Sequence, residues 1–311
     1  MNLLVVGGCG FTGSVLVNDL LKEGHRVTVF DAHWFGCHLE HHERLTVLVG
    51  DIRHDQVPMK GIEAVVHLAN VANDPSVDLR PDLTWEVNVL ATMSMVEAAI
   101  KAGVSRFIYA SSGSVYGVKK ETEVIEDLEL VPISTYNKTK MVAERVLMSY
   151  QDRIKIWIVR PATVCGISPR MRLDLSVNLL TYQALKNSKI TVFGGDQVRP
   201  NIHIDDLSAV YRHLLSGNAP EGTYNAGFEN ISILTMANEI ASKTGAQIVV
   251  TESNDPRSYR QNSAKLTDTG FSPRKGVSEA IDEVIAAFEQ GQLHDQDDWN
   301  NVRSMIAKGL T

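Results

Sequence analysis

The chain has 311 residues, of which 44% are hydrophobic, and this allows one large α/β domain or two smaller ones. Its 30 basic and 37 acidic residues give a formal net charge of -7, so it lacks the positive surface that a nucleic-acid backbone requires. No apolar run approaches the roughly 18 to 20 residues of a membrane span, and strand-like residues begin at Asn2. We therefore expect a cytoplasmic globular protein with no signal peptide, no membrane anchor and no nucleic-acid partner.

Short β-rich runs alternate with helical patterns in the first half of the chain. The runs are typical of strands buried on both faces of a parallel sheet, and they span residues 3–6, 27–30, 45–49, 64–68, 107–110 and 154–159. Apolar residues at three- and four-residue spacing predict helices over residues 14–22, 83–102 and 136–150. The alternation predicts an α/β fold with a Rossmann-type, doubly wound parallel sheet.

The pattern loosens after Pro161. Short strands are expected at residues 190–193 and 202–204, and helices near 172–186 and 232–244. We expect a first domain over residues 1–165, with part of 203–228 returning to it, and a smaller C-terminal lid over 166–202 and 229–311. The polar, acidic tail from Gln292 onward is expected to be frayed or packed on the surface, without a function.

The cysteines and several histidines are candidate metal ligands. The three cysteines are too few and too scattered for a disulfide framework, which favours free thiols in a reducing compartment: Cys9, Cys37 and Cys165. One short segment combines a cysteine with four histidines: His33, Cys37, His38, His41 and His42. It lacks a second ligand pair at the spacing of a zinc finger, so the favoured interpretation is a solvated loop and we expect no metal.

A glycine-rich turn follows the first predicted strand. That strand runs directly into Gly7-Gly8-Cys9-Gly10-Phe11-Thr12-Gly13 and then into a helix, where glycines permit a tight turn and a backbone-first approach to a pyrophosphate. Asp31 ends the next strand, where its carboxylate can accept hydrogen bonds from both ribose hydroxyls and would repel a 2′-phosphate. Asp51 follows the third strand and can accept from an adenine amino group. The sequence therefore predicts NAD rather than NADP.

Side chains suited to acid-base catalysis lie in the middle of the chain. Tyr136 and Lys140 stand one helical turn apart on the same face. A phenol is a poor base at neutral pH, and a nearby ammonium favours the phenolate. This spacing alone is more often found on a surface helix. The strand at residues 107–110, however, ends in Ser111 and Ser112, which places hydroxyls at the carboxyl edge of the sheet, where ligands bind.

With these residues, the chain resembles the extended short-chain dehydrogenases/reductases of the nucleotide-sugar epimerase/dehydratase family. The motifs occur in the family's order between about residues 1 and 275: GxxGxxG at Gly7, His67-Leu68-Ala69, Asn88, the Ser-Ser-Gly-Ser-Val-Tyr-Gly stretch from Ser111, YxxxK at Tyr136, and Arg160-Pro161. The resemblance implies that Tyr136 is the acid/base, that Lys140 lowers its pKa and holds the nicotinamide ribose, and that Ser112 bonds the reacting sugar oxygen. It implies an NAD site made by Gly7, Gly10, Phe11, Thr12, Gly13, Asp31, Asp51, Ile52, Leu68, Ala69, Asn88, Ser111, Tyr136, Lys140 and Pro161.

The resemblance also implies a nucleotide-diphosphate sugar as the substrate, bound by the lid. Ser114 would line the sugar pocket beside Ser112, Asn178 would meet the diphosphate, and Val192 lies on a strand that would pass the base. Arg199 and Arg257 are the expected further diphosphate contacts, with Arg260 close behind, because the planar guanidinium can meet phosphate oxygens with two hydrogen bonds. Surface arginines in a loop-rich lid are the alternative.

The residues beside Ser112 bear on the reaction. Dehydratases of this family carry an Asp-Glu pair there, whereas this chain has Gly113 and Ser114, and the cysteine that would suggest 3,5-epimerisation is also missing at Ser114. The favoured hypothesis is NAD-dependent epimerisation, with C4 as the favoured carbon. The alternative is an NAD(P)H-dependent reductase or dehydrogenase of a (keto) nucleotide sugar, which uses the same three side chains. A non-catalytic redox sensor is disfavoured, because it has no use for Ser112, Tyr136 and Lys140. As in the family, we expect a homodimer through the helices over residues 83–102 and 136–150.

Overall fold

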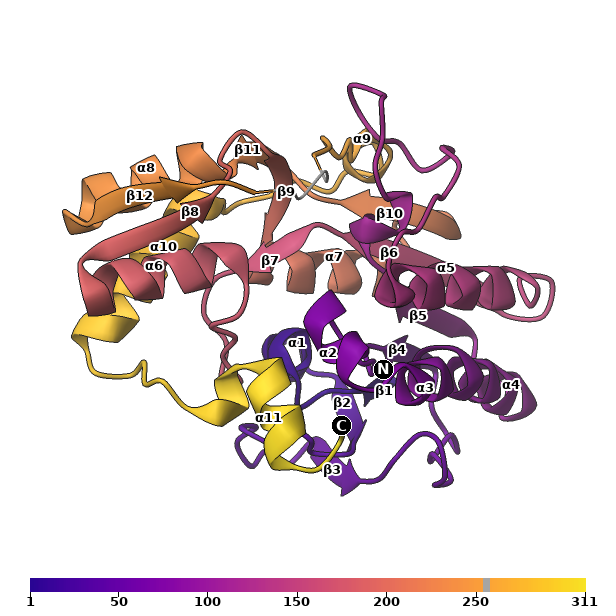
Figure 1. The fold of residues 1–311 in the computed structure, drawn as a ribbon. Helices are drawn as coiled ribbons and strands as arrows, with labels where there is room; N and C mark the ends of the chain where they lie inside the picture. The colour runs from indigo at the N-terminus through magenta and orange to yellow at the C-terminus, as the bar shows by residue number, and fades with distance from the viewer. Residues whose placement is uncertain (254–257) are drawn as a thin grey trace.

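Seven strands form one parallel sheet in the structure, a computed structural model that describes residues 1–253 and 258–311 (Figure 1). The strands are β1 (Asn2–Val6), β2 (Arg26–Asp31), β3 (Leu45–Val49), β4 (Ala64–His67), β5 (Arg106–Ala110), β6 (Lys155–Pro161) and β10 (Gly222–Ala226). Their order across the sheet is β10-β6-β5-β4-β1-β2-β3. The strand order reverses beside β1, where a doubly wound sheet opens its ligand crevice. The predicted Rossmann-type α/β fold is confirmed.

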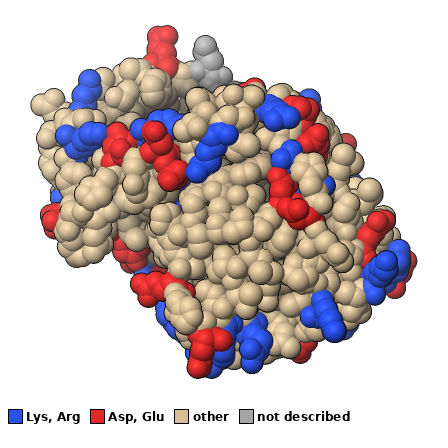
Figure 2. All heavy atoms as spheres, turned by 90° about the horizontal axis from the view of Figure 1, so that it is seen from below, with Lys and Arg blue, Asp and Glu red and all other residues tan. Residues whose placement is uncertain are grey.

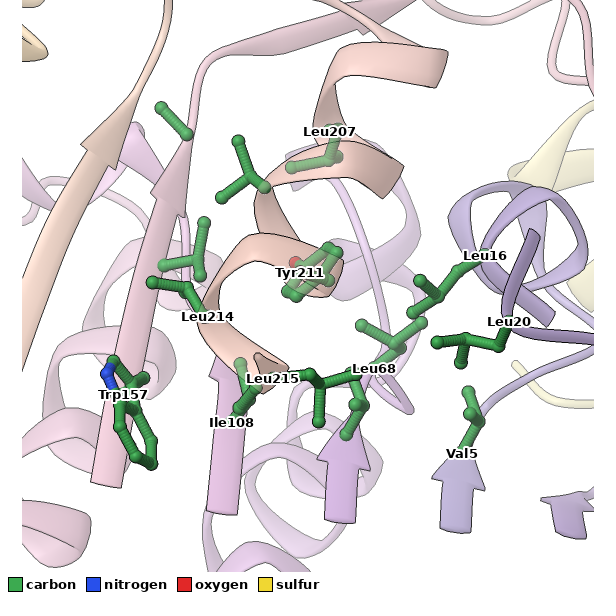
Figure 3. Close-up of a cluster of buried hydrophobic side chains, with 14 of the residues drawn as sticks. Val5, Leu16, Leu20, Leu68, Ile108, Trp157, Leu207, Tyr211, Leu214 and Leu215 are labelled. Carbon is green, nitrogen blue, oxygen red and sulfur yellow. The ribbon is translucent and has the colours of Figure 1, made fainter. Parts of the chain in front are cut away.

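Helices cover both faces of this sheet because its strands are apolar on both sides. Along β1, Leu3 and Val5 face helices α1 (Phe11–Lys22) and α7 (Ile204–Leu215). Leu4 and Val6 face α4 (Ala91–Lys101) and α5 (Thr135–Met148). Figure 3 shows the first of these cores, in which Leu16 and Leu20 of α1 meet Tyr211 of α7 above the strands. The period-two alternation of a strand thus supplies both cores.

The helix expected over residues 83–102 is divided. It consists of α3 (Pro81–Trp85), a π-helical turn η1 (Glu86–Leu90) and α4, and a short helix α2 (Asp74–Leu79) precedes it. Asn88 lies in the π turn and is 1% exposed. Its amide accepts from the backbone N–H of Val71 and donates to the Thr139 hydroxyl. The π turn therefore aims Asn88 at the loop after β4 and at α5, as such turns often do near functional sites.

Two small sheets with flanking helices make up the remainder of the second half. One sheet joins β7 (Thr163–Cys165), β9 (Val198–His203) and β11 (Glu229–Ser232), and the other pairs β8 (Lys189–Phe193) with β12 (Gln247–Thr251). The remaining helices here are α6 (Ser176–Asn187), α8 (Ile233–Thr244), α9 (Ala264–Thr267) and α10 (Val277–Glu289). The division into two domains at the predicted boundaries stays a prediction; β10, from the segment 203–228, pairs with β6 in the large sheet.

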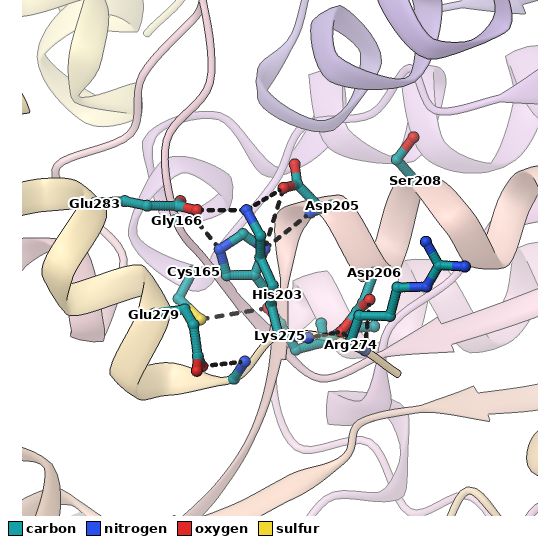
Figure 4. Close-up of polar contacts among 12 residues, drawn as sticks. Cys165, Gly166, His203, Asp205, Asp206, Ser208, Arg274, Lys275, Glu279 and Glu283 are labelled. Carbon is teal, nitrogen blue, oxygen red and sulfur yellow. Dashed lines mark hydrogen bonds and ion pairs between the residues drawn. The ribbon is translucent and has the colours of Figure 1, made fainter. Parts of the chain in front are cut away.

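A polar network fastens α10 to the start of α7 (Figure 4). The buried His203 ring lies 3.0 Å from Glu283 of α10, and the Lys275 ammonium bonds both Glu283, at 2.6 Å, and Asp205, at 2.7 Å. Burial opposes ionisation of Glu283, but hydrogen bonds from His203 and Lys275 lower its pKa to about 2. Each of these polar groups therefore has a hydrogen-bond partner within the network.

The C-terminal tail is folded. It forms a short turn η3 (Asp297–Trp299) and helix α11 (Asn301–Ala307), which lies beside α2 (Figure 1). Met305 packs with Val71 and Val77, and the Ser304 hydroxyl donates to the carbonyl oxygen of Trp34. Of the two expected states of the tail, the structure shows the surface-packed one, with α11 lying against loops that lead into the crevice of the large sheet.

Two further observations concern the helices and the surface charge. Within residues 1–253 and 258–311, no helix combines the length and apolarity needed to cross a membrane. The face shown in Figure 2 carries basic and acidic side chains mixed around its edges, without a large patch of one sign.

Candidate active site

The glycine-rich turn connects β1 to α1 at the carboxyl edge of the sheet. Gly7 has a φ of +79°, and a Cβ on it would lie 2.5 Å from the backbone nitrogen of Ala69. A Cβ on Gly13 would lie 2.4 Å from the carbonyl oxygen of Gly7. Gly10 is the N-cap of α1, whose first N–H groups have no intrahelical partners. The turn therefore offers a backbone cradle suited to a pyrophosphate at a helix N-terminus.

A cavity of about 770 Å³ opens over this cradle. Residues that directly follow β1, β4, β5 and β6 meet in its wall, because parallel strands end at one edge. Most of the predicted site residues line it: Gly7, Gly10, Phe11, Thr12, Gly13, Asp31, Asp51, Ile52, Leu68, Ala69, Ser111, Ser112, Ser114, Tyr136 and Pro161. Asn88 and Lys140 lie behind this wall.

The two predicted carboxylates have different partners. Asp31 accepts from the backbone N–H groups of Cys9, at 2.9 Å, and His33, at 2.8 Å. Burial raises the pKa of Asp31, and these N–H groups counteract the rise. Asp51 is paired with the Arg53 guanidinium at 2.7 Å, which lowers the pKa of Asp51 against the effect of burial. Asp31 is thus positioned by the cradle itself.

Ser112 and Tyr136 form the polar centre of the cavity. The Ser112 hydroxyl lies 2.7 Å from that of Ser114, which in turn donates to the amide oxygen of Asn137. Burial raises the pKa of Tyr136 to about 12, while a hydrogen bond with Ser112 and the nearby charge of Arg172 oppose this rise. The phenol therefore keeps its proton at neutral pH in this state.

Lys140 lies one turn after Tyr136 on α5 and is 1% exposed. Its ammonium donates to the carbonyl oxygen of Ala110 at 2.7 Å and stays 6.0 Å from the centroid of the Tyr136 ring. Burial lowers the pKa of Lys140 to about 7, although Glu144 favours the charged form. In this structure Lys140 does not lower the pKa of Tyr136, because its ammonium is engaged by the end of β5.

A buried ion pair supports this corner of the site. The Glu144 carboxylate, on α5, pairs with the Arg160 guanidinium at 2.7 Å and accepts a short hydrogen bond from the Ser111 hydroxyl. Arg160 also donates to the Tyr116 phenol. Because every one of these polar groups has a hydrogen-bond partner, the network fixes the positions of β5, β6 and α5 relative to one another.

Two arginines at the cavity were not singled out in the sequence. Arg170 stacks on the ring of Phe35 at 4.3 Å and donates to the Asn301 amide oxygen. Arg172 makes two hydrogen bonds to Asp174, at 2.8 and 3.0 Å. Burial lowers the pKa of Arg170 to about 9, and the positive charge of Arg172 contributes to the lowering. The alternating Arg-x-Arg-x-Asp pattern after β7 was a possible signal, but nothing in it indicates that the chain turns back toward the cavity.

The structure does not bring three predicted substrate contacts to this cavity. Asn178 is fully buried and bonds the backbone of Gly166 and Arg172, so it shapes the loop that carries Arg172. Val192 is buried in the core between β8 and the helices of the second half. Arg199 lies on β9, outside the cavity wall. Arg257 lies outside the described residues.

Comparisons with known proteins agree with this architecture. The model of the NAD dependent epimerase/dehydratase family matches residues 3–227. A UDP-glucose 4-epimerase of Lactobacillus helveticus is 30% identical over 322 residues, covering 92% of this chain and 95% of that protein. UDP-glucuronic acid decarboxylase 1 of Danio rerio is 29% identical over 318 residues, covering 94% of this chain and 73% of that protein.

Solved structures show the same similarity in three dimensions. The UDP-glucuronic acid 4-epimerase of Bacillus cereus, in complex with UDP-glucuronic acid and NAD, superposes with a TM-score of 0.82 at 28% identity. The alignment covers 93% of this chain and 99% of that chain. Together with the glycine cradle and the Ser-Tyr-Lys arrangement, these matches show that the chain belongs to the NAD-dependent epimerase/dehydratase family of nucleotide-sugar enzymes, whose cofactor is NAD, as the sequence predicted.

Proposed function

We propose that this protein epimerises a nucleotide-diphosphate sugar at C4. The observation that carries the proposal is the hydrogen-bonded pair of Ser112 and Tyr136 in one cavity with the glycine cradle, where Gly113 and Ser114 occupy the positions of a dehydratase's acid-base pair. NAD, when bound, accepts a hydride from the sugar carbon and returns it. Return to the opposite face inverts that carbon, so no further acid or base is required.

The cradle and its neighbours are proposed to hold the cofactor. Gly7 and Gly13 permit the close backbone packing that forms the turn, Gly10 leaves open space for a pyrophosphate, and Asp31 faces the same cavity with an ionisable carboxylate suited to ribose hydroxyls. The other proposed contacts are Phe11, Thr12, Asp51, Ile52, Leu68, Ala69, Asn88, Ser111, Tyr136, Lys140 and Pro161. Asn88 and Lys140 would act from the second layer, through the Val71 loop and the end of β5.

Tyr136 is the proposed proton acceptor and donor for the sugar hydroxyl. Its phenol is largely protonated at neutral pH in this structure, so removal of a substrate proton requires added positive charge near its oxygen. Arg172 already supplies part of that charge, and Lys140 stands one helical turn away. Ser112, which bonds the phenol, is placed to bond the same sugar oxygen.

The diphosphate of the substrate needs positive charge, and Arg170 and Arg172 supply it within the cavity wall. Arg172 lies near Tyr136, on the side where the sugar would react, and Arg170 lies near Asp31, on the cofactor side. We propose Arg172 as a substrate contact. Ser114, Asn178, Val192, Arg199 and Arg257 remain proposals from the sequence.

We also propose a cytoplasmic homodimer. Apolar side chains remain exposed on the helices that the family resemblance assigns to the dimer contact, with Leu90 55%, Met93 37% and Met148 40% exposed. Burying them against a second copy would form a four-helix contact. The three cysteines are free thiols, which supports a reducing compartment.

The stoichiometry of the cofactor tests the reaction. Purified protein is incubated with UDP-glucose or UDP-glucuronic acid and a trace of NAD, and the products are followed by NMR and NADH absorbance. The proposal predicts the 4-epimer with no net NADH. With NAD in excess, formation of one NADH per sugar would assign a dehydrogenase, and release of carbon dioxide from the uronic acid would assign a decarboxylase. In a separate incubation with a keto nucleotide sugar and NADH, stoichiometric NADH consumption would assign a reductase.

A matched pair of variants tests Tyr136. Tyr136→Phe should lower kcat by about 10²- to 10⁴-fold while NAD binding is preserved, because only the proton-transfer group is removed. Tyr150→Phe is the control, since Tyr150 lies beyond the end of α5 and its phenol donates to Glu97. Wild-type turnover by the Tyr136 variant would remove Tyr136 from the mechanism.

A further inference from the structure

Two cysteines and a histidine meet at the edge of the glycine cradle. The Cys9 sulfur lies 3.1 Å from the Cys37 sulfur and 3.4 Å from Nε2 of His33. These three ligand atoms all lie within 4.8 Å of one another. Cys9 comes from the turn between β1 and α1, and the other two come from the loop after β2. We propose that Cys9, His33 and Cys37 bind one zinc-class divalent metal ion.

The distances fit a tetrahedral metal better than a disulfide. Zinc–sulfur and zinc–nitrogen bonds of about 2.3 and 2.0 to 2.1 Å place two ligated sulfurs about 3.8 Å apart and a sulfur and a nitrogen about 3.6 Å apart. The Cys9–His33 distance of 3.4 Å already meets this geometry, and the Cys37 sulfur must withdraw only slightly. A disulfide at about 2.05 Å would leave His33 without a role. Cys37 is exposed and can adjust.

The backbone holds the three side chains together. His33 has a φ of +54°, in the left-handed region that residues other than glycine seldom adopt. Both oxygens of Asp31 are used here: one accepts from the N–H of Cys9 and the other from the N–H of His33. One carboxylate therefore fixes the backbone of two of the three ligand residues.

The chemistry of the three groups selects the metal. Two thiolates and one neutral imidazole suit zinc, and two thiolate charges balance the charge of a divalent ion. Water would complete the tetrahedron on the solvent side, where Cys37 is exposed. Of the neighbouring histidines, His42 accepts from the backbone N–H of Arg44 and is outside the cluster. The ion would clamp the loop after β2 onto the cradle, a structural role separate from the proposed reaction.

Metal titration tests the site directly. The full chain is stripped of metal, kept reduced with a phosphine and titrated with Co²⁺ and then with Zn²⁺. We expect about one Co²⁺ per chain, with the intense near-ultraviolet absorbance of a cobalt–thiolate bond, displaced by Zn²⁺. Zinc should also raise the Tm, because it binds the folded chain more tightly than the unfolded chain.

Two variants test ligands from the loop after β2, and a third variant is the control. Cys37→Ser and His33→Asn should each weaken Co²⁺ binding at least 10-fold; asparagine tolerates the left-handed backbone, so the second variant removes the ligand without adding strain. Cys165→Ser, at a buried cysteine outside the cluster, should bind like the wild type. Circular dichroism checks that each variant is folded.

Three outcomes would overturn the proposal. The first is the absence of thiolate absorbance in the wild type, and the second is unchanged binding in both Cys37→Ser and His33→Asn. The third is a reduced protein that binds no metal but loses two hydrogen atoms on treatment with a low-molecular-weight disulfide, which would assign a Cys9–Cys37 disulfide. None of these results depends on turnover, so the site and the proposed epimerase activity can fail separately.

Discussion

The ammonium of Lys140 donates a hydrogen bond to the carbonyl oxygen of Ala110 at 2.7 Å, joining α5 to the last residue of β5. The lysine is buried against the rings of Tyr109 and Tyr136, at 4.9 and 6.0 Å from its nitrogen. An amine held this way has few polar partners, which is why burial brings its pKa to about 7. The group next to Tyr136 is therefore poised to change charge near neutral pH.

The first prediction concerns stability against pH. The folded pKa of Lys140 is depressed to about 7 from 10.5, so between these values the unfolded chain binds more protons than the folded chain and stability rises with pH. Lys140→Met removes the contribution of this amine to the pH dependence of stability. The difference in unfolding free energy between wild type and variant should grow by up to about 1.4 kcal/mol per pH unit between about pH 7.5 and 9.5 in urea denaturation. Lys138→Met, at an exposed position, should show a constant difference. A constant difference for Lys140→Met would refute the depressed pKa.

A second prediction separates folding from cofactor binding in the glycine turn. A Cβ on Gly10 would meet only the Gly7 carbonyl oxygen, at 3.4 Å, so Gly10→Ala should leave the Tm nearly unchanged while occupying space needed by the pyrophosphate. NAD affinity, measured by calorimetry, should fall at least 10-fold. Gly13→Ala should lower both the Tm and the NAD affinity, because its Cβ would lie 2.4 and 2.7 Å from backbone atoms. Tight NAD binding by Gly10→Ala would place the pyrophosphate elsewhere.

Much of this architecture was predictable from local patterns. The strands, the glycine turn and the Ser-Tyr-Lys set depend on residues whose spacing directly encodes a period or a turn, so the α/β fold and most of the cavity wall followed from them. The divided helix around Asn88 did not, because a π turn depends on tertiary contacts with Val71 and Thr139.

Contacts between segments that lie far apart in the sequence could not be predicted for the same reason. Cys9 joins His33 and Cys37 only when the turn after β1 and the loop after β2 lie side by side, so the short spacing of His33 and Cys37 does not indicate it. The polar tail likewise gave no indication that Asn301 would meet Arg170 across the cavity. Such pairings are set by packing rather than by sequence spacing.

A third prediction tests the choice of NAD over NADP. Asp31→Asn retains the size of the side chain but removes the charge that would bond ribose hydroxyls and repel a 2′-phosphate. NAD affinity should fall by about 10- to 100-fold, in line with the loss of charged hydrogen bonds, and the preference over NADP should shrink. Asp78→Asn, an exposed position on α2, is the control. An unchanged preference in competition binding would show that another group selects NAD.

A fourth prediction concerns the ion pair that joins the cavity wall to the tail. Asp174 accepts from Arg172, from the Asn73 amide and from the backbone N–H of Asn301. Asp174→Asn leaves the buried Arg172 unpaired and should cost about 3 kcal/mol in urea denaturation, whereas Arg172→Met combined with Asp174→Leu should cost less than Asp174→Asn alone.

The same pair has a defined pH window. Burial opposes ionisation of Asp174, but Arg172 and the N–H of Asn301 hold its pKa below the ordinary value of 3.8. The stabilisation is therefore present above about pH 4 and is lost as pH falls below it. A wild-type chain whose stability relative to Asp174→Asn does not decline in this acid range would contradict the ion-pair account.

The fate of the hydrogen on C4 tests the proposed epimerisation most directly. The protein is given a nucleotide sugar deuterated at C4, together with NAD and a pool of free unlabelled NADH, and the sugars are separated and analysed by NMR. Return of the same hydride within one cavity predicts that deuterium remains at C4 in both epimers. Appearance of the label in free NADH, with one NAD reduced per sugar oxidised, or no inversion at C4, would contradict the account.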